Sequence, residues 1–242
     1  MGPAPPAVLT GPPSCQRDPS CKGPVSDHGQ VVRSPVVEPV YWGPGTRGDR
    51  PLVKATLRAM TRSGWWALLR QYGVGPLRAE RGRFVGYRPP ITIFGELPAP
   101  PVPSPSPDTV LLVLLGSAAS QGMSERSYCG WHGRLPVTGT LVAYVVMGGG
   151  HGSCLDPSQA IAHELAEAAT DPSPGQGWRS PAGWEVADLC ARSPAATFQL
   201  LDRRVSLPAL WDQAAGSCAQ PPSVARAGGR AARASPTSAS RP

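Results

Sequence analysis

The residues of this chain that could do chemistry are concentrated between positions 160 and 172, in the run Ala-Ile-Ala-His-Glu-Leu-Ala-Glu-Ala-Ala-Thr-Asp-Pro. At about 100° per residue, an α-helix would bring four side chains that bind protons or metals into one quadrant. These four are His163, Glu164, Glu167 and Asp171. The apolar Ile161, Leu165 and Ala168 would lie opposite, so the pattern predicts a helix with its chemistry on one side.

The spacing His163-Glu-x-x-Glu167 is a variant of the His-Glu-x-x-His arrangement of zinc peptidases. In that arrangement the first and last residues bind the metal, and the residue after the first His is the general base. The pattern therefore predicts His163 and Glu167 as metal ligands and Glu164 as a base. The alternative is an ordinary solvated helix face, because a His followed by two Glu residues arises often by chance.

Capping signals on both sides of this run support a helix. Asp156 can cap the first turn, and Pro157 suits the first helical position. Asp171 precedes Pro172, which disfavours helical geometry there. We therefore expect Asp171 to lie at the helix end, behind the metal ligands rather than among them.

Apolar periodicity predicts the elements that must position this helix. Strands are expected over 31–42, 109–115 and 140–147, two helices over 52–72 with a break at Gly64, and a hairpin over 197–207 around Asp202. The continuous run Thr109 to Leu115 is typical of a strand buried on both faces. The two adjacent tryptophans, Trp65 and Trp66, are expected in the core. Together these elements predict an α+β fold with a central mixed sheet.

A chain of 242 residues with 40% hydrophobic residues can bury one sizeable core. We expect a single domain over residues 31–218, a disordered N-terminal segment over 1–30 and a disordered basic tail over 219–242, because both ends are rich in turn-forming residues. The apolar run at 109–115 has the length of a strand, which is too short to span a membrane.

The formal charge of +7 is not concentrated in a binding stripe. Four arginines lie in the acid-free tail, at positions 226, 230, 233 and 241, so the rest of the chain carries 7 − 4 = +3. No run of basic residues is interleaved with aromatic residues, which argues against nucleic-acid binding.

Six cysteines, at positions 15, 21, 129, 154, 190 and 218, lack the Cys-x-x-Cys pairs of a zinc ribbon or redox motif. An even count spread along the chain favours disulfides and an oxidising compartment. Residues 1–25 nevertheless show no apolar run of signal-peptide length after a basic start.

Several separated blocks of the sequence resemble the EXORDIUM-like (phosphate-induced protein) family, from Val31 to Cys218. The blocks are VEPVYWGPG, SGWWALLRQYGVG, YCGWHG, HELAEAATDPSPGQGW, EVADLC and LWDQAAGSC. The resemblance implies a zincin-like fold, secretion, and a role in growth signalling or the cell wall. One departure is Arg179, which follows the tryptophan of GQGW where family members often have an aromatic residue.

The matched blocks supply the rest of the expected site. EVADLC offers Glu185 as the preferred third metal ligand, with Asp188 either binding as well or orienting His163. In YCGWHG, His132 is the best remaining candidate, as an extra ligand or as a stabiliser of the developing oxyanion. The metal is expected to be Zn²⁺, although a set of one imidazole and several carboxylates also suits Ca²⁺ or Mn²⁺. Alternatively, the acids pair with arginines and leave His163 as a core histidine.

Three functions follow from these patterns. The first is a secreted, metal-dependent peptidase in which Glu164 takes a proton from water and hydroxide attacks a peptide carbonyl. The second is a non-catalytic extracellular protein that binds a partner or carbohydrate and keeps the metal for structure, and the third is a different metal-dependent hydrolase. We expect a monomer acting on a peptide or protein. Two disulfides, Cys129 with Cys154 and Cys190 with Cys218, are expected beside the site.

Overall fold

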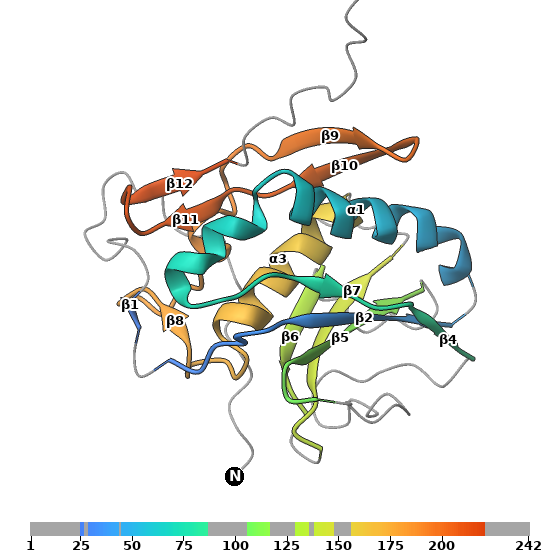
Figure 1. Ribbon diagram of the computed structural model, residues 1–242, viewed down its shortest axis with the longest axis horizontal. Helices are drawn as coiled ribbons and strands as arrows, with labels where there is room; N and C mark the ends of the chain where they lie inside the picture. Colours follow the sequence, from blue (N-terminus) through green and yellow to red (C-terminus); the bar gives the residue numbers. More distant parts are fainter. Residues whose placement is uncertain are drawn as a thin grey trace, which may run out of the picture.

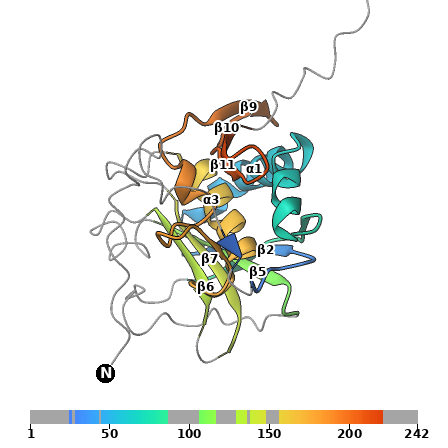
Figure 2. The same cartoon turned by 90° about the vertical axis from the view of Figure 1, so that its left-hand side faces the viewer.

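In the computed structural model, a mixed β-sheet lies on one side of two α-helices, and a β-hairpin covers the helices from the other side (Figures 1 and 2). The structure describes residues 29–43, 45–86, 106–116, 129–135, 138–147 and 156–220, together with the backbone of 25–26. The predicted α+β class with a central mixed sheet is therefore confirmed.

The six-stranded sheet has the order β3-β2-β5-β7-β6, with β4 also paired to β2. Its central strands run parallel: β2 (Val36–Trp42), β5 (Thr109–Leu115) and β7 (Leu141–Val146). At one edge β6 (Gly130–Arg134) is antiparallel to β7. At the other edge two short strands run parallel to β2, namely β3 (Arg78–Ala79) and β4 (Arg83–Val85).

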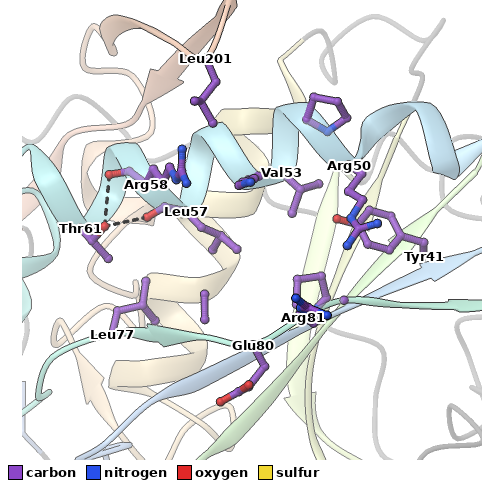
Figure 3. Close-up of a pocket in the computed structure, with 15 residues that line it drawn as sticks. Tyr41, Arg50, Val53, Leu57, Arg58, Thr61, Leu77, Glu80, Arg81 and Leu201 are labelled. Atoms are coloured by element: carbon purple, nitrogen blue, oxygen red, sulfur yellow. Dashed lines mark hydrogen bonds between the residues drawn. The ribbon is translucent and has the colours of Figure 1, made fainter.

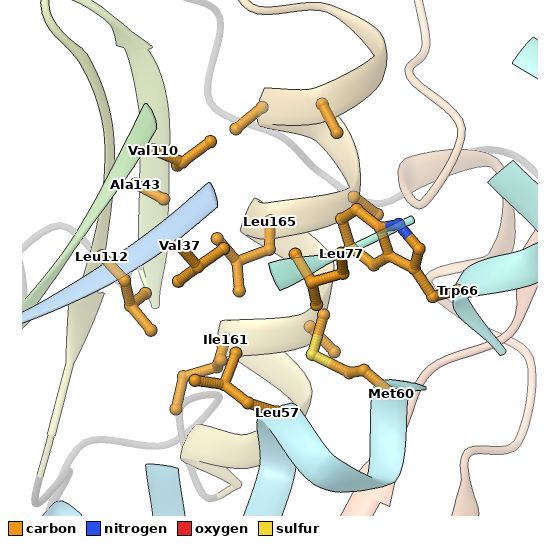
Figure 4. Packing of buried hydrophobic residues seen from close by; sticks show 14 of the residues in the cluster. Val37, Leu57, Met60, Trp66, Leu77, Val110, Leu112, Ala143, Ile161 and Leu165 are labelled. Carbon is orange, nitrogen blue, oxygen red and sulfur yellow. The ribbon is translucent and has the colours of Figure 1, made fainter. Parts of the chain in front are cut away.

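Every residue of β5 is buried, which confirms the prediction for this apolar run. Because successive side chains of a strand point to opposite faces, alternate residues of β5 belong to two different clusters. Val110, Leu112 and Leu114 belong to the main core beside the helices. Figure 4 shows the first two of them. The intervening leucines and valine belong to a cluster on the other face of the sheet.

The segment predicted as two helices forms one α-helix and one 3₁₀ helix. A 3₁₀ turn (Thr46–Asp49) leads into α1 (Arg50–Arg62), and a second 3₁₀ helix follows as Trp66–Tyr72. The break falls at Gly64, as expected, and Gly73 ends the 3₁₀ helix with φ 83°, which glycine adopts without steric cost. Trp65 and Trp66 are both buried in the core, which confirms their predicted role.

The central helix α3 (Pro157–Thr170) begins as the sequence predicts. The Asp156 side chain accepts hydrogen bonds from the backbone N–H groups of Ser158 and Gln159, and Pro157 occupies the first turn. Ile161 and Leu165 enter the main core beside Leu57 of α1 (Figure 4). The helix thus lies between the sheet and the hairpin, and its polar side is left to face β6.

The predicted hairpin consists of β9 (Ala196–Leu200) and β10 (Arg203–Leu207), which pair antiparallel. Its turn residues Leu201 and Asp202 have φ values of 51° and 59°. The chain then forms a second hairpin from β11 (Leu210–Asp212) and β12 (Ser217–Ala219).

Two short elements complete the described chain. The strand β8 (Trp178–Arg179) pairs with β1 (Val25–Ser26), so two residues of the segment 1–30 join a strand pair. A short 3₁₀ helix (Asp188–Cys190) is tied to β12 by the predicted disulfide between Cys190 and Cys218, which is confirmed. Among the described helices, none is long and apolar enough to cross a membrane.

Candidate metal centre

A buried cluster of imidazoles and carboxylates lies on the polar side of α3, between the edge strand β6 and the segment that follows β8. It joins all six residues that the sequence proposed for the site: His132, His163, Glu164, Glu167, Glu185 and Asp188. They come from three separate parts of the chain, and α3 contributes three of them. We call this set the metal centre.

The first potential metal-binding group consists of His163, Glu167 and Asp188. His163 Nε2 lies 3.1 Å from Glu167 Oε2 and 3.4 Å from Asp188 Oδ1. The two carboxylates are buried, whereas the His163 side chain is 23% exposed. The Asp188 backbone N–H donates to Glu167 Oε1 at 3.1 Å, which fixes the segment after β8 onto α3.

The second potential group consists of His132, Glu164 and Glu167, all of them buried. His132 Nδ1 lies 3.2 Å from Glu164 Oε2 and 3.7 Å from Glu167 Oε2. Glu167 therefore belongs to both groups. Each group has one imidazole and two carboxylates, so either could hold a metal ion.

Gly130 allows β6 to approach α3 closely enough for this contact. A Cβ atom at position 130 would lie 2.5 Å from both Cγ and Oε1 of Glu164. Any other residue would therefore displace the Glu164 side chain or push the strand away. The glycine two positions before His132 is a requirement of the site.

Arg179 and Glu185 form the wall of the centre behind His132. Arg179 donates from Nη2 to Glu185 Oε1 at 3.2 Å, and Glu185 Oε1 lies 3.6 Å from His132 Nε2. Asp188, and not Glu185, completes the group around His163. A ligand role for Glu185 stays a prediction.

Asp171 lies at the end of α3, as expected, and organises the loop that leads to Arg179. Its side chain is fully buried and accepts hydrogen bonds from three backbone N–H groups, those of Gly175, Gln176 and Gly177. Arg179 Nε donates to the same carboxylate at 2.8 Å. The acid therefore positions Arg179, which in turn holds Glu185.

Burial and charge shift the pKa values of the centre in opposite directions. Burial opposes protonation of His132 and His163, but the carboxylates around them raise both pKa values well above the usual range. Burial and the nearby Asp188 raise the pKa of Glu167 to about 8. Burial also opposes ionisation of Glu185, yet His132 and Arg179 lower its pKa to about 2.

The donor set fits a divalent cation. A metal binds neutral imidazoles and ionised carboxylates, and in that state the two histidines and four acids carry a net charge of −4, which Arg179 beside Glu185 reduces to −4 + 1 = −3. Buried charge of one sign is costly without compensation. His132 Nε2 is buried and has no hydrogen-bond partner among the described residues. One imidazole with two carboxylates is a ligand set that Zn²⁺, Mn²⁺ or Ca²⁺ can occupy.

Two residues that support the centre, Arg179 and Gly130, were not predicted from the sequence. In the sequence, Arg179 stands out only as a departure from the family pattern after GQGW. A further sequence signal is that Arg179 is the one basic residue between Asp171 and Glu185, the two acids that it contacts. Gly130 had a weaker signal, as a small residue two positions before His132.

The predicted pairing of Cys129 with Cys154 lies outside the described residues, because Cys154 is not among them.

Comparisons with models of known protein families, with curated proteins and with solved structures found no match to this chain. The EXORDIUM-like resemblance therefore stays a prediction.

Proposed function

We propose that this chain is a secreted, zincin-like peptidase of the EXORDIUM-like kind, in which His163, Glu167 and Asp188 hold a divalent cation. The observation that carries the proposal is that the ligand atoms of these three residues lie within 4.8 Å of one another. Zn²⁺ is the first choice, and Mn²⁺ or Ca²⁺ would also suit two carboxylates. The disulfide between Cys190 and Cys218 supports an oxidising, extracellular location.

Glu164 is the general base of the proposed reaction. The chemistry that a divalent cation supplies at such a site is the acidification of a water and the polarisation of a carbonyl oxygen. Glu164 takes a proton from the attacking water and returns it to the leaving amine. His132 holds the Glu164 carboxylate through Nδ1, which makes it a positioning residue.

Substrate access is proposed from the side of His163. Among the six residues of the centre, only His163 is more than slightly exposed, whereas His132, Glu164 and Glu167 are each below 9%. A peptide would thus meet the metal from the His163 side, with His132 behind the base.

A second candidate function is a non-catalytic extracellular protein with a structural metal. The deep burial of the centre favours it, because structural sites are closed and catalytic sites keep an open position. The retention of Glu164 favours catalysis instead, since a structural site needs ligands and no base.

Replacing Glu164 by Gln separates the two candidates. The amide keeps the shape of the side chain but cannot take a proton, so we expect hydrolysis of an unfolded casein to fall by about 10² to 10⁴-fold. Metal content, measured by mass spectrometry of the purified variant, is expected to stay at the wild-type value. The matched control is Asp202→Asn, in the turn of the β9–β10 hairpin and outside the centre.

An unchanged rate in Glu164→Gln would show that Glu164 is not the base. A wild-type protein that contains metal but cleaves no unfolded substrate would favour the structural candidate.

A further inference from the structure

A groove along α1 lies apart from the metal centre and shares no residue with it. We call it the α1 groove, and its lining residues are drawn in Figure 3. Its volume is about 1070 Å³, just above the upper end of the usual range for ligand-binding sites. One wall is the helix α1, and the other is the segment between β3 and β4 at the edge of the sheet. The turn of the β9–β10 hairpin adds Leu201 above the helix (Figure 3).

The edge wall exists because Pro39 interrupts strand pairing. Proline has no backbone N–H, so the pairing of β2 with the edge stops after Val37 and resumes at Val40. The Glu80 backbone N–H still donates to Val37 O at 2.9 Å, and the segment from Glu80 to Gly82, between β3 and β4, lines the groove. Gly82 allows this, because a Cβ there would lie 2.6 Å from the Tyr41 ring.

The floor of the groove is apolar and its rim is basic. Buried Val53, Leu57 and Leu77 supply aliphatic surface at the bottom. Four cationic side chains line the groove against one acid, Glu80: they are Arg50, Lys54, Arg58 and Arg81. Within the described part of the chain, none of the four forms an ion pair. The net charge of the lining is therefore 4 − 1 = +3.

Exposed apolar side chains also gather here. Among the described residues, the large hydrophobic side chains that are exposed are Leu201 and Phe84. Leu201 lines the groove, 45% exposed, with a φ of 51° that normally favours Asn or Gly. Phe84 stacks on Tyr41, another lining residue. A ligand with both apolar and anionic groups would satisfy these surfaces.

We propose that the α1 groove binds an extended acidic peptide of a partner protein. The lining runs along α1 from Arg50 to Thr61, about 16 Å of helix, which an extended peptide of about five residues would span. Alternate side chains of such a peptide point in opposite directions, so aliphatic residues reach the floor while carboxylates meet the rim.

The lining favours a peptide over other polyanions. A sulfated oligosaccharide has no aliphatic side chains to bury on Val53, Leu57 and Leu77. Single-stranded nucleic acid needs aromatic surfaces for its bases, and Tyr41, the one aromatic side chain among the described lining residues, already stacks on Phe84. Among the described strands, β3 and β4 pair with β2 alone. The backbone groups on their other edge therefore form no strand pairing with the described residues. Extended peptides use such edges.

Fluorescence anisotropy with the labelled peptide Asp-Leu-Glu-Leu-Asp tests the proposal. We expect saturable binding to the wild-type protein, and none for a peptide with lysine in place of each acid. The double variant Lys54→Glu/Arg58→Glu is expected to weaken binding about tenfold, since two attractions become repulsions. The matched control is Arg62→Glu/Arg70→Glu, two exposed arginines that do not line the groove, with an expected change below about twofold.

Three results would overturn the proposal. They are no binding of the acidic peptide, equal affinity in the Lys54→Glu/Arg58→Glu variant, or tighter binding of a sulfated hexasaccharide that competes with the peptide. Removal of metal by chelation is expected to leave peptide affinity unchanged, because the groove contains no residue of the metal centre.

Discussion

His132 Nδ1 lies 3.2 Å from Glu164 Oε2, although the two residues are 32 positions apart in the sequence. The contact joins the edge strand β6 to the central helix α3. It gives the proposed base a fixed orientation, because one carboxylate oxygen is held by a buried imidazole.

Replacing Gly130 by Ala tests whether this orientation matters. The new methyl group would lie 2.5 Å from Glu164 Oε1, and the carboxylate has to move away. We expect peptide hydrolysis to fall by about 10²-fold, the scale of a 1 Å misplacement of a catalytic group. Metal content should persist, because His163, Glu167 and Asp188 remain in place.

The control for this substitution is Gly48→Ala, in the 3₁₀ turn before α1, where a Cβ meets no atom within 4 Å. A Gly130→Ala protein with full activity would mean that the position of Glu164 does not limit the reaction.

Replacing Asp171 by Asn tests the support behind the centre. The fully buried carboxylate accepts three backbone hydrogen bonds and the Arg179 pair, and the amide cannot accept all of them. We expect a loss of about 2 to 4 kcal/mol in the free energy of unfolding, measured by urea denaturation. Asp202→Asn, in an exposed hairpin turn, should change it by less than about 0.5 kcal/mol. Equal effects of the two variants would contradict the supporting role of Asp171.

The stability of the metal-free protein should decrease with rising pH. The folded pKa values of His132 and His163 are raised, so their stabilising charge is complete below about pH 6.5 and is lost as the pH rises through the folded values. Glu167, with a pKa raised to about 8, binds its proton more tightly in the folded state and acts in the same direction. Urea midpoints of EDTA-treated protein at pH 6, 7 and 8 measure the trend.

Added metal should weaken or reverse this loss of stability with rising pH. A cation binds the deprotonated ligands, and it competes more successfully with protons for them as the pH rises. A metal-free protein whose urea midpoint increases from pH 6 to pH 8 would contradict the proposed crowding of carboxylates around the two histidines.

Local patterns predicted much of the fold. The helix α3 followed from its cap and its one-sided polar residues, and β5 from a continuous apolar run, since both signals depend on neighbours in sequence. The segment after Gly64 was predicted as a helix and forms a 3₁₀ helix, a difference that apolar spacing does not resolve. The break between β3 and β4 lies opposite Pro39, which is distant in sequence and cannot donate a backbone hydrogen bond to this edge.

The candidate site was predictable as a set of residues but not as an arrangement. His163 and Glu167 share a helix face, so their proximity follows from spacing alone. Asp188 rather than Glu185 completes the group around His163. This depends on the direction of a turn that is held against α3 by the hydrogen bond from the Asp188 backbone N–H to Glu167. The role of His132 depends on how β6 pairs with β7, which the local sequence does not specify.

The proposed metal centre is tested most directly by the metal content of the purified wild-type protein and of His163→Ala, measured by mass spectrometry. We predict one equivalent of a divalent metal in the wild-type protein and its loss in the variant, while Asp202→Asn keeps it. Two equivalents would place a metal on Glu164 as well and contradict its role as base. The absence of stoichiometric metal from the wild-type protein, or full retention of metal in His163→Ala, would contradict the binding of a divalent cation by His163, Glu167 and Asp188.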